Sequence, residues 1–87
     1  MAQIKIQPKD LMGQSATKLS YNFTNDDDVS RVDISFQLQD DNDNVLFAGV
    51  HSMIDDAANN ISDYSNWNKN IVDGCDWLLG KIGAVKA

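Results

Sequence analysis

The stretch RVDISFQLQDDNDNVLFAGVHSM, residues 31–53, contains the clearest strand pattern of the chain. Its first part alternates apolar and polar side chains from Val32 to Gln39. Because successive side chains of a β-strand point to opposite faces of a sheet, this alternation predicts a half-buried strand. The next apolar run, near residues 45–53, is apolar on both alternating faces, which predicts a central strand. Gly49 within it could mark a bulge or a place where another element comes close.

Between these two strands lie the residues DDNDN, positions 40–44. Asp40, Asn42 and Asn44 match the start of a calcium-binding loop, in which alternate side-chain oxygens wrap the ion. The match then fails, because Val45 stands where such a loop needs glycine and His51 where it needs a bidentate glutamate. We therefore expect no metal here but a hairpin turn, with Asn42 or Asn44 in a left-handed conformation.

Two further strands are predicted upstream of this hairpin. Isoleucines alternate with polar residues in 3–7, a strand that we expect Pro8 to end, and residues 8–15 then read as a loop. Apolar and polar residues alternate again in 19–24, up to the acidic run Asp26, Asp27 and Asp28.

The last third of the chain changes to a helical period. Trp67, Ile71, Cys75, Leu78, Leu79 and Ile82 follow one another at spacings of 4, 4, 3, 1 and 3, which indicates an amphipathic helix near residues 65–82. Ser62, Asp63 or Ser65 could cap its start, and Gly80 or Gly83 could end it. A helical period also begins near Asp55, so a first helical segment is expected before residue 62.

These elements predict an α+β fold in a single domain, residues 1–87. The expected sheet has four mainly antiparallel strands, near residues 3–7, 19–24, 31–39 and 45–53, and one C-terminal amphipathic helix packs on one of its faces. The predicted core consists of Val32, Ile34, Phe36, Leu38, Trp67, Ile71, Cys75 and Leu78.

The net charge of the chain limits the kinds of partner that it can bind. Thirteen Asp and no Glu stand against seven Lys and Arg, for a net charge of −6. Contacts with phosphates need clustered cations, so we expect no direct binding of nucleic acid. No segment approaches the 18 or so apolar residues that span a membrane, and the N-terminus lacks a signal-peptide pattern. The expected location is the cytoplasm of a host cell or a virion. The expected partner is another protein, either a second copy of this chain or a larger complex, and it is neutral or basic.

Catalytic groups are scarce. His51 and Cys75 are the only residues of their types, and no glycine-rich phosphate loop is present. Nucleophilic catalysis needs a nucleophile, a base and an orienting group together, so we expect a protein that is not an enzyme and has no cofactor. His51 reads as a structural histidine, and Cys75 as a small core residue in a reducing compartment.

Two stretches, IKIQPKDLMG at 4–13 and SDYSNWNKNIVDGCDWLLGKIG at 62–83, together with the acidic, Asn-rich composition, give the chain a family likeness. It resembles the small uncharacterised proteins of phages and prophages of Gram-positive bacteria. The resemblance is general and includes no diagnostic motif, so it assigns no residue a role. It implies either a virion or assembly component, or an acidic inhibitor of a host defence nuclease.

The function expected from these observations is a non-enzymatic protein–protein interaction module, of the kind that serves as a phage structural or assembly subunit. Trp77 is its first predicted contact, because Trp67 and Trp77 cannot both be central to one narrow helical stripe. The alternative is an acidic inhibitor of the anti-CRISPR kind, whose Asp side chains imitate phosphates in the basic groove of a nuclease or other DNA-binding protein. Its candidate surfaces are Asp26, Asp27 and Asp28 with Asp33, or Asp40, Asp41 and Asp43.

Overall fold

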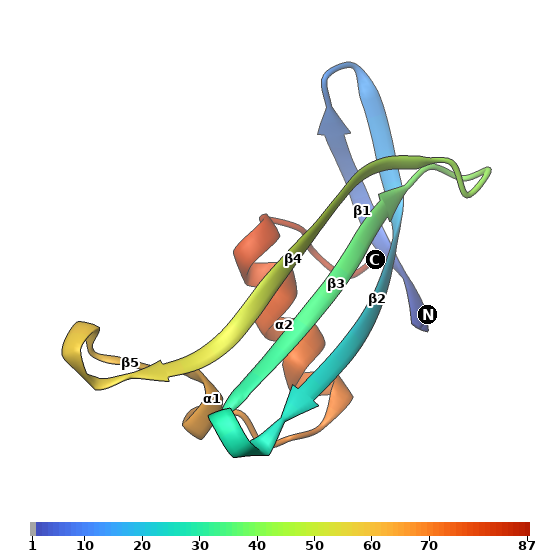
Figure 1. Ribbon diagram of the computed structural model, residues 1–87. Coiled ribbons are helices and arrows are strands. Elements are labelled where there is room, and N and C mark those ends of the chain that lie inside the picture. Colours follow the sequence, from blue (N-terminus) through green and yellow to red (C-terminus); the bar gives the residue numbers. More distant parts are fainter. Residues whose placement is uncertain (1) are drawn as a thin grey trace.

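The computed structural model describes residues 2–87 as one antiparallel sheet with a helix lying across one face (Figure 1). The strands lie in chain order, β1-β2-β3-β4-β5. They are β1 (Ala2–Leu11), β2 (Gln14–Asp26), β3 (Arg31–Gln39), β4 (Val45–Asp56) and the short β5 (Ile61–Ser62). The remaining elements are the 3-10 turns η1 (Asp27–Val29) and η2 (Ala57–Asn59), the one-turn helix α1 (Asp63–Asn66) and the main helix α2 (Ile71–Ile82). The predicted α+β class is confirmed.

The register between strands sorts the side chains into a covered face and an open face. Phe36 in β3 lies between Tyr21 of β2 and Gly49 of β4. Side chains in register with Phe36 point toward α2, so the apolar half of the alternation is buried. The buried apolar residues are Ile6, Ala16, Leu19, Tyr21, Val32, Ile34, Phe36, Leu38, Met53, Tyr64, Cys75, Leu78 and Leu79.

The predicted core is correct in most of its members. The four β3 residues, Cys75 and Leu78 are all buried. Trp67 is only partly buried. The prediction for Ile71 was wrong, because it opens α2 and its side chain stays 58% exposed at the end of the helix.

The predicted loop at 8–15 was wrong. β1 continues past Pro8 to Leu11, and β2 already begins at Gln14. Pro8 is tolerated because the pairing with β2 shifts register between Lys5 and Lys9, where the ladder does not need its missing N–H. The turn itself consists of Met12 and Gly13, both with positive φ.

β4 also departs from its predicted place. It is not a central strand, because β5 pairs only with Asp55 and Asp56 at its end. The helix predicted from Asp55 was wrong, since the strand runs on to Asp56 and is followed by η2 and β5. The bulge lies near Leu46 instead of Gly49. The predicted close approach at Gly49 is confirmed, because a Cβ there would lie 3.1 Å from Phe36 Cζ.

The main helix is shorter than predicted. α2 begins at Ile71 because the Asn70 side chain accepts a hydrogen bond of 2.8 Å from the Asp73 amide, so the predicted caps Ser62, Asp63 and Ser65 were wrong for this helix. It ends at Gly83, as one of the two alternatives predicted, with φ at +69°. No helix within residues 2–87 has the length and apolar content to cross a lipid bilayer.

Candidate protein-interaction surface

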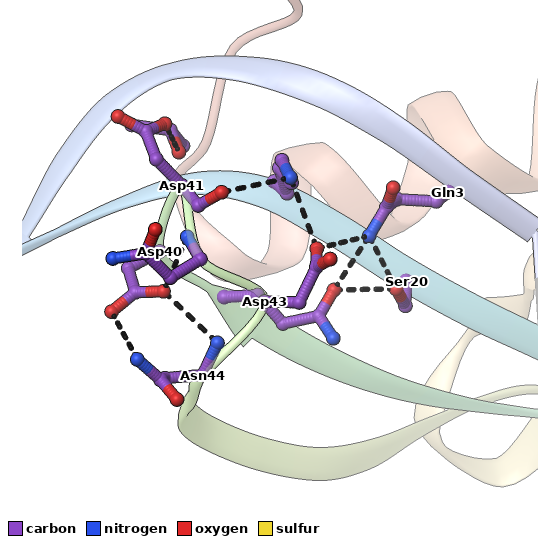
Figure 2. Close-up of polar contacts among 10 residues, drawn as sticks. Gln3, Ser20, Asp40, Asp41, Asp43 and Asn44 are labelled. Atoms are coloured by element: carbon purple, nitrogen blue, oxygen red, sulfur yellow. Dashed lines mark hydrogen bonds and ion pairs between the residues drawn. The ribbon is translucent and has the colours of Figure 1, made fainter.

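The acidic loop between β3 and β4 is held together by its own first residue (Figure 2). Asp40 Oδ1 accepts hydrogen bonds of 2.9 Å from the amides of Asn42 and Asn44, and its Oδ2 accepts one from the Asn44 side chain. These bonds, first among them those from Asn44, lower the pKa of Asp40. The predicted hairpin is confirmed, but the left-handed residue is Asp43 instead of Asn42 or Asn44.

The rest of the loop is tied to the open face of the sheet. Asp43 accepts hydrogen bonds from Lys18 Nζ at 3.0 Å and from Gln3 Nε2 at 3.3 Å, and Lys18 followed by Gln3 lowers its pKa. Asp41 Oδ1 accepts a bond of 2.5 Å from the Thr17 hydroxyl. Gln3 also reaches toward Ser20 (Figure 2). The loop carboxylates are therefore engaged with the same chain.

The second acidic group surrounds η1, at the other end of β3. Asp26 caps this turn by accepting from the Asp28 amide at 3.1 Å. Asp27 accepts hydrogen bonds from the Tyr64 hydroxyl and from Lys69 Nζ, and both lower its pKa, Tyr64 more than Lys69. Asp27 thus joins this turn to the segment around α1.

Asp33, on the open face of β3, has partners of its own. It accepts hydrogen bonds of 2.5 Å from the Ser52 hydroxyl and 2.7 Å from Arg31 Nε. These bonds lower its pKa, Ser52 contributing most.

The two predicted acidic surfaces do not form one patch. They stand at opposite ends of the nine-residue strand β3, which separates them by about 30 Å at the rise of ~3.3 Å per residue of a strand. Among residues 2–87, no three His, Cys, Asp or Glu side chains are grouped as a metal site would need.

Trp77 lies where α2 faces β4. Its ring meets His51 edge-on, with the ring centres 6.4 Å apart, and Lys81 Nζ lies 5.4 Å from its centre. It lines a cleft of about 330 Å³, together with Met53, Asp63, Asn66, Trp67, Asn68 and Asp73. Trp77 is partly buried against the core, and its predicted role as a partner contact stays a prediction.

His51 and Cys75 are packed as structural residues. His51 stacks on Phe36 at 5.6 Å between ring centres. Cys75 is buried, and burial raises the pKa of its thiol, which disfavours the reactive thiolate.

The feature that sequence reasoning missed is the outer edge of β4. Within the described residues, the structure pairs no strand with this edge between Val45 and Ile54. Three large apolar side chains are exposed on the strand, namely Val45, Phe47 and Val50. Residues 44–54 contain no Asp, Glu, Lys or Arg, a signal that could have drawn attention to this stretch.

The opposite edge of the sheet, in β1, is protected. The C-terminal segment pairs with it, because the Gln7 amide donates to Val85 O at 2.8 Å and the Ala87 amide to Lys5 O at 3.2 Å. Pro8 and the register shift further interrupt this edge. Charge, proline, bulges and a covering segment are the devices that keep a strand edge from pairing with another chain.

The comparisons with known proteins leave the likeness to phage proteins as a prediction. No family model, no curated protein and no solved structure matches the chain. The candidate site therefore depends on the geometry alone, and the β4 edge is its most distinctive part.

Proposed function

We propose that this protein is a non-enzymatic protein–protein interaction module that recruits its partner to the outer edge of β4. The observation that carries the proposal is the contrast between the two edges of the sheet: β1 is covered by the C-terminal segment, and β4 is uncharged and unpaired from Val45 to Ile54 among the described residues. In a phage-type assembly, such a module would be a structural or assembly subunit.

The physical basis of this recognition is strand addition. An unpaired edge presents a row of backbone donors and acceptors that an extended segment of another protein can satisfy. Backbone hydrogen bonds then supply affinity, and alternate side chains supply specificity. The exposed side chains of Phe47 and Val50 lie on opposite faces of the sheet along this edge, where an incoming strand can cover them.

The test compares two valines of equal exposure. Val50 on β4 is 60% exposed, and Val72, which belongs to α2 instead of the edge strand, is 61% exposed. We expect Val50→Lys to abolish retention of partner proteins from the native source, whereas Val72→Lys leaves it unchanged. Partner retention that is equal in the two variants would reject β4 as the binding edge.

The second candidate, an acidic inhibitor that imitates nucleic acid, is supported by the net charge of −6. Its support is reduced because Asp27, Asp33 and Asp43 each form an ion pair with a Lys or Arg side chain of the same chain. Binding by mimicry should weaken steeply with salt, since salt screens the attraction between the carboxylates and a basic groove. Replacing Asp26 and Asp28 by Asn should weaken it again, whereas binding at the β4 edge should not respond to that replacement.

A further inference from the structure

We infer that the β4 edge pairs with the β4 edge of a second copy of this chain, in an antiparallel arrangement about a twofold axis. The inference rests on the proposed function, because it names the partner of the same edge. It would join the two sheets into one continuous sheet that carries both α2 helices on the same face (Figure 1).

The β4 edge is free of charged residues in a strongly acidic chain. Each copy carries a net charge of −6, so most surfaces of two copies repel one another. Residues 44–54 are the longest stretch of the chain without Asp, Glu, Lys or Arg. Like charges directly opposite one another destabilise a strand pair. The β4 edge is therefore the place where two copies can pair along a strand without like charges facing each other.

A twofold axis at Gly49 defines the register of this pairing. It places residues 47–51 of one copy, which are uncharged and whose outer edge is unpaired, opposite the same residues of the other. In this register Phe47 lies opposite the second copy's His51, on the face that carries α2. Val50 lies opposite the second copy's Ala48 on the open face, where both side chains are exposed. The pairing thus covers Phe47 and Val50, two of the three large apolar side chains that β4 leaves exposed.

The outer edge of β4 is interrupted at both of its ends. β5 covers the outer edge at Asp55 and Asp56, and the register shift near Leu46 interrupts it at the other end. These two features leave residues 47–53 as the uninterrupted part of the edge. Because the acidic loop at 40–44 of one copy then approaches Asp55 of the other, the ends repel, and added salt should strengthen the dimer.

Sedimentation velocity of the purified protein at micromolar to millimolar concentrations tests the inference. We expect a concentration-dependent dimer that Val50→Lys abolishes and that Val72→Lys leaves intact. We also expect the dimer to be tighter at high salt than at low salt. A wild-type protein that stays monomeric over the whole range, or a dimer that survives Val50→Lys, would overturn the inference.

The register has its own test. Ala48→Asp added to Val50→Lys places opposite charges across the twofold axis twice, so the double variant V50K/A48D should recover the dimer. Failure to recover it would reject the register centred on Gly49. If Val50→Lys unfolds the protein, amide hydrogen exchange of the wild type decides: amides of residues 47–51 should gain protection as concentration rises, and unchanged protection would overturn the inference.

These outcomes separate the inference from the proposed function. If the pure protein stays monomeric but Val50→Lys abolishes partner retention, the proposed interaction module is supported and self-pairing is rejected. If both the dimer and partner retention survive Val50→Lys, self-pairing and the proposed binding edge are both rejected.

Discussion

Replacing Gly74 by alanine should destabilise the protein, although the same change elsewhere in α2 should stabilise it. A Cβ at Gly74 would lie 2.2 Å from Phe23 Cε2 and 2.5 Å from Phe23 Cζ, distances far below van der Waals contact. The Phe23 ring cannot move freely, because the rings of Tyr21 and Trp67 lie 5.7 and 5.9 Å from its centre. The Trp67 indole nitrogen, 3.2 Å from the added Cβ, closes another direction.

The size of the effect follows from two opposing terms. Alanine gains about 1 kcal/mol over glycine inside a helix. Overpacking of a fixed neighbour costs ~1–3 kcal/mol or more, and here the ring would have to move by more than about 1.3 Å to restore ordinary contact between carbon atoms at about 3.5 Å. We expect Gly74→Ala to lower the free energy of unfolding by ~1–2 kcal/mol, since the second term is larger. For a domain of this size, that lowers Tm by about 5–15 °C.

The matched control is Gly80→Ala in the same helix. A Cβ at Gly80 meets nothing within 4 Å, so only the gain in helix propensity remains. Its Tm should rise by about 4–8 °C. Thermal melting followed by circular dichroism measures both variants. Equal stabilisation of the two would refute the packing of α2 on Phe23, as would a Gly74→Ala penalty that persists in a Phe23→Ala background.

The remaining predictions concern the core, the acidic loop and metal. Phe36→Ala should reduce stability by about 3–5 kcal/mol, and an unchanged denaturation midpoint would reject its central place. Asp40→Ala should lower Tm more than Asp41→Ala, because Asp40 accepts the bonds that close the loop. The pKa values of Asp27, Asp33, Asp40 and Asp43 are lowered in the folded state, so their contribution is complete above the unfolded pKa of about 4 and is lost as pH falls through the folded values. Acid titration should therefore lower Tm below about pH 4, and a Tm independent of pH there would contradict these contacts. Calcium should change neither Tm nor the amide spectra of residues 40–44, and a saturable shift would show that a site exists.

The alternation and the helical period were enough to predict the main elements, because each signal is local. Side chains two apart on β3 share a face in any sheet, so Val32, Ile34, Phe36 and Leu38 were assigned to the core without knowledge of their neighbours. The hairpin at 40–44 was predicted on the same basis, since short Asp and Asn side chains hydrogen-bond adjacent backbone wherever the loop lies.

The failures came where a local signal was interpreted without its tertiary context. Pro8 normally ends a strand, yet here the shifted register removes the need for its N–H. The period that starts near Asp55 resembled a helix, yet Asp56 caps a 3-10 turn between two strands, by accepting from the Ala58 amide at 3.2 Å. In both places the pairing of distant segments overrode the local preference.

Local sequence patterns were sufficient for the α+β class, the apolar face of β3 and the acidic hairpin turn, and they limited the end of the last helix to Gly80 or Gly83, because these features depend on residues close in the chain. Which strands form the edges of the sheet depends on the tertiary structure. A strand that is apolar on both faces has the same sequence pattern whether another strand or solvent lies beside it. β4 lies next to the edge of the sheet because the strands are arranged in chain order and only the short β5 follows it. The C-terminal segment covers β1 instead of β4 through hydrogen bonds between residues about 80 positions apart. The candidate site therefore lies on an edge that the local pattern predicted to be covered, because coverage is a property of the whole fold.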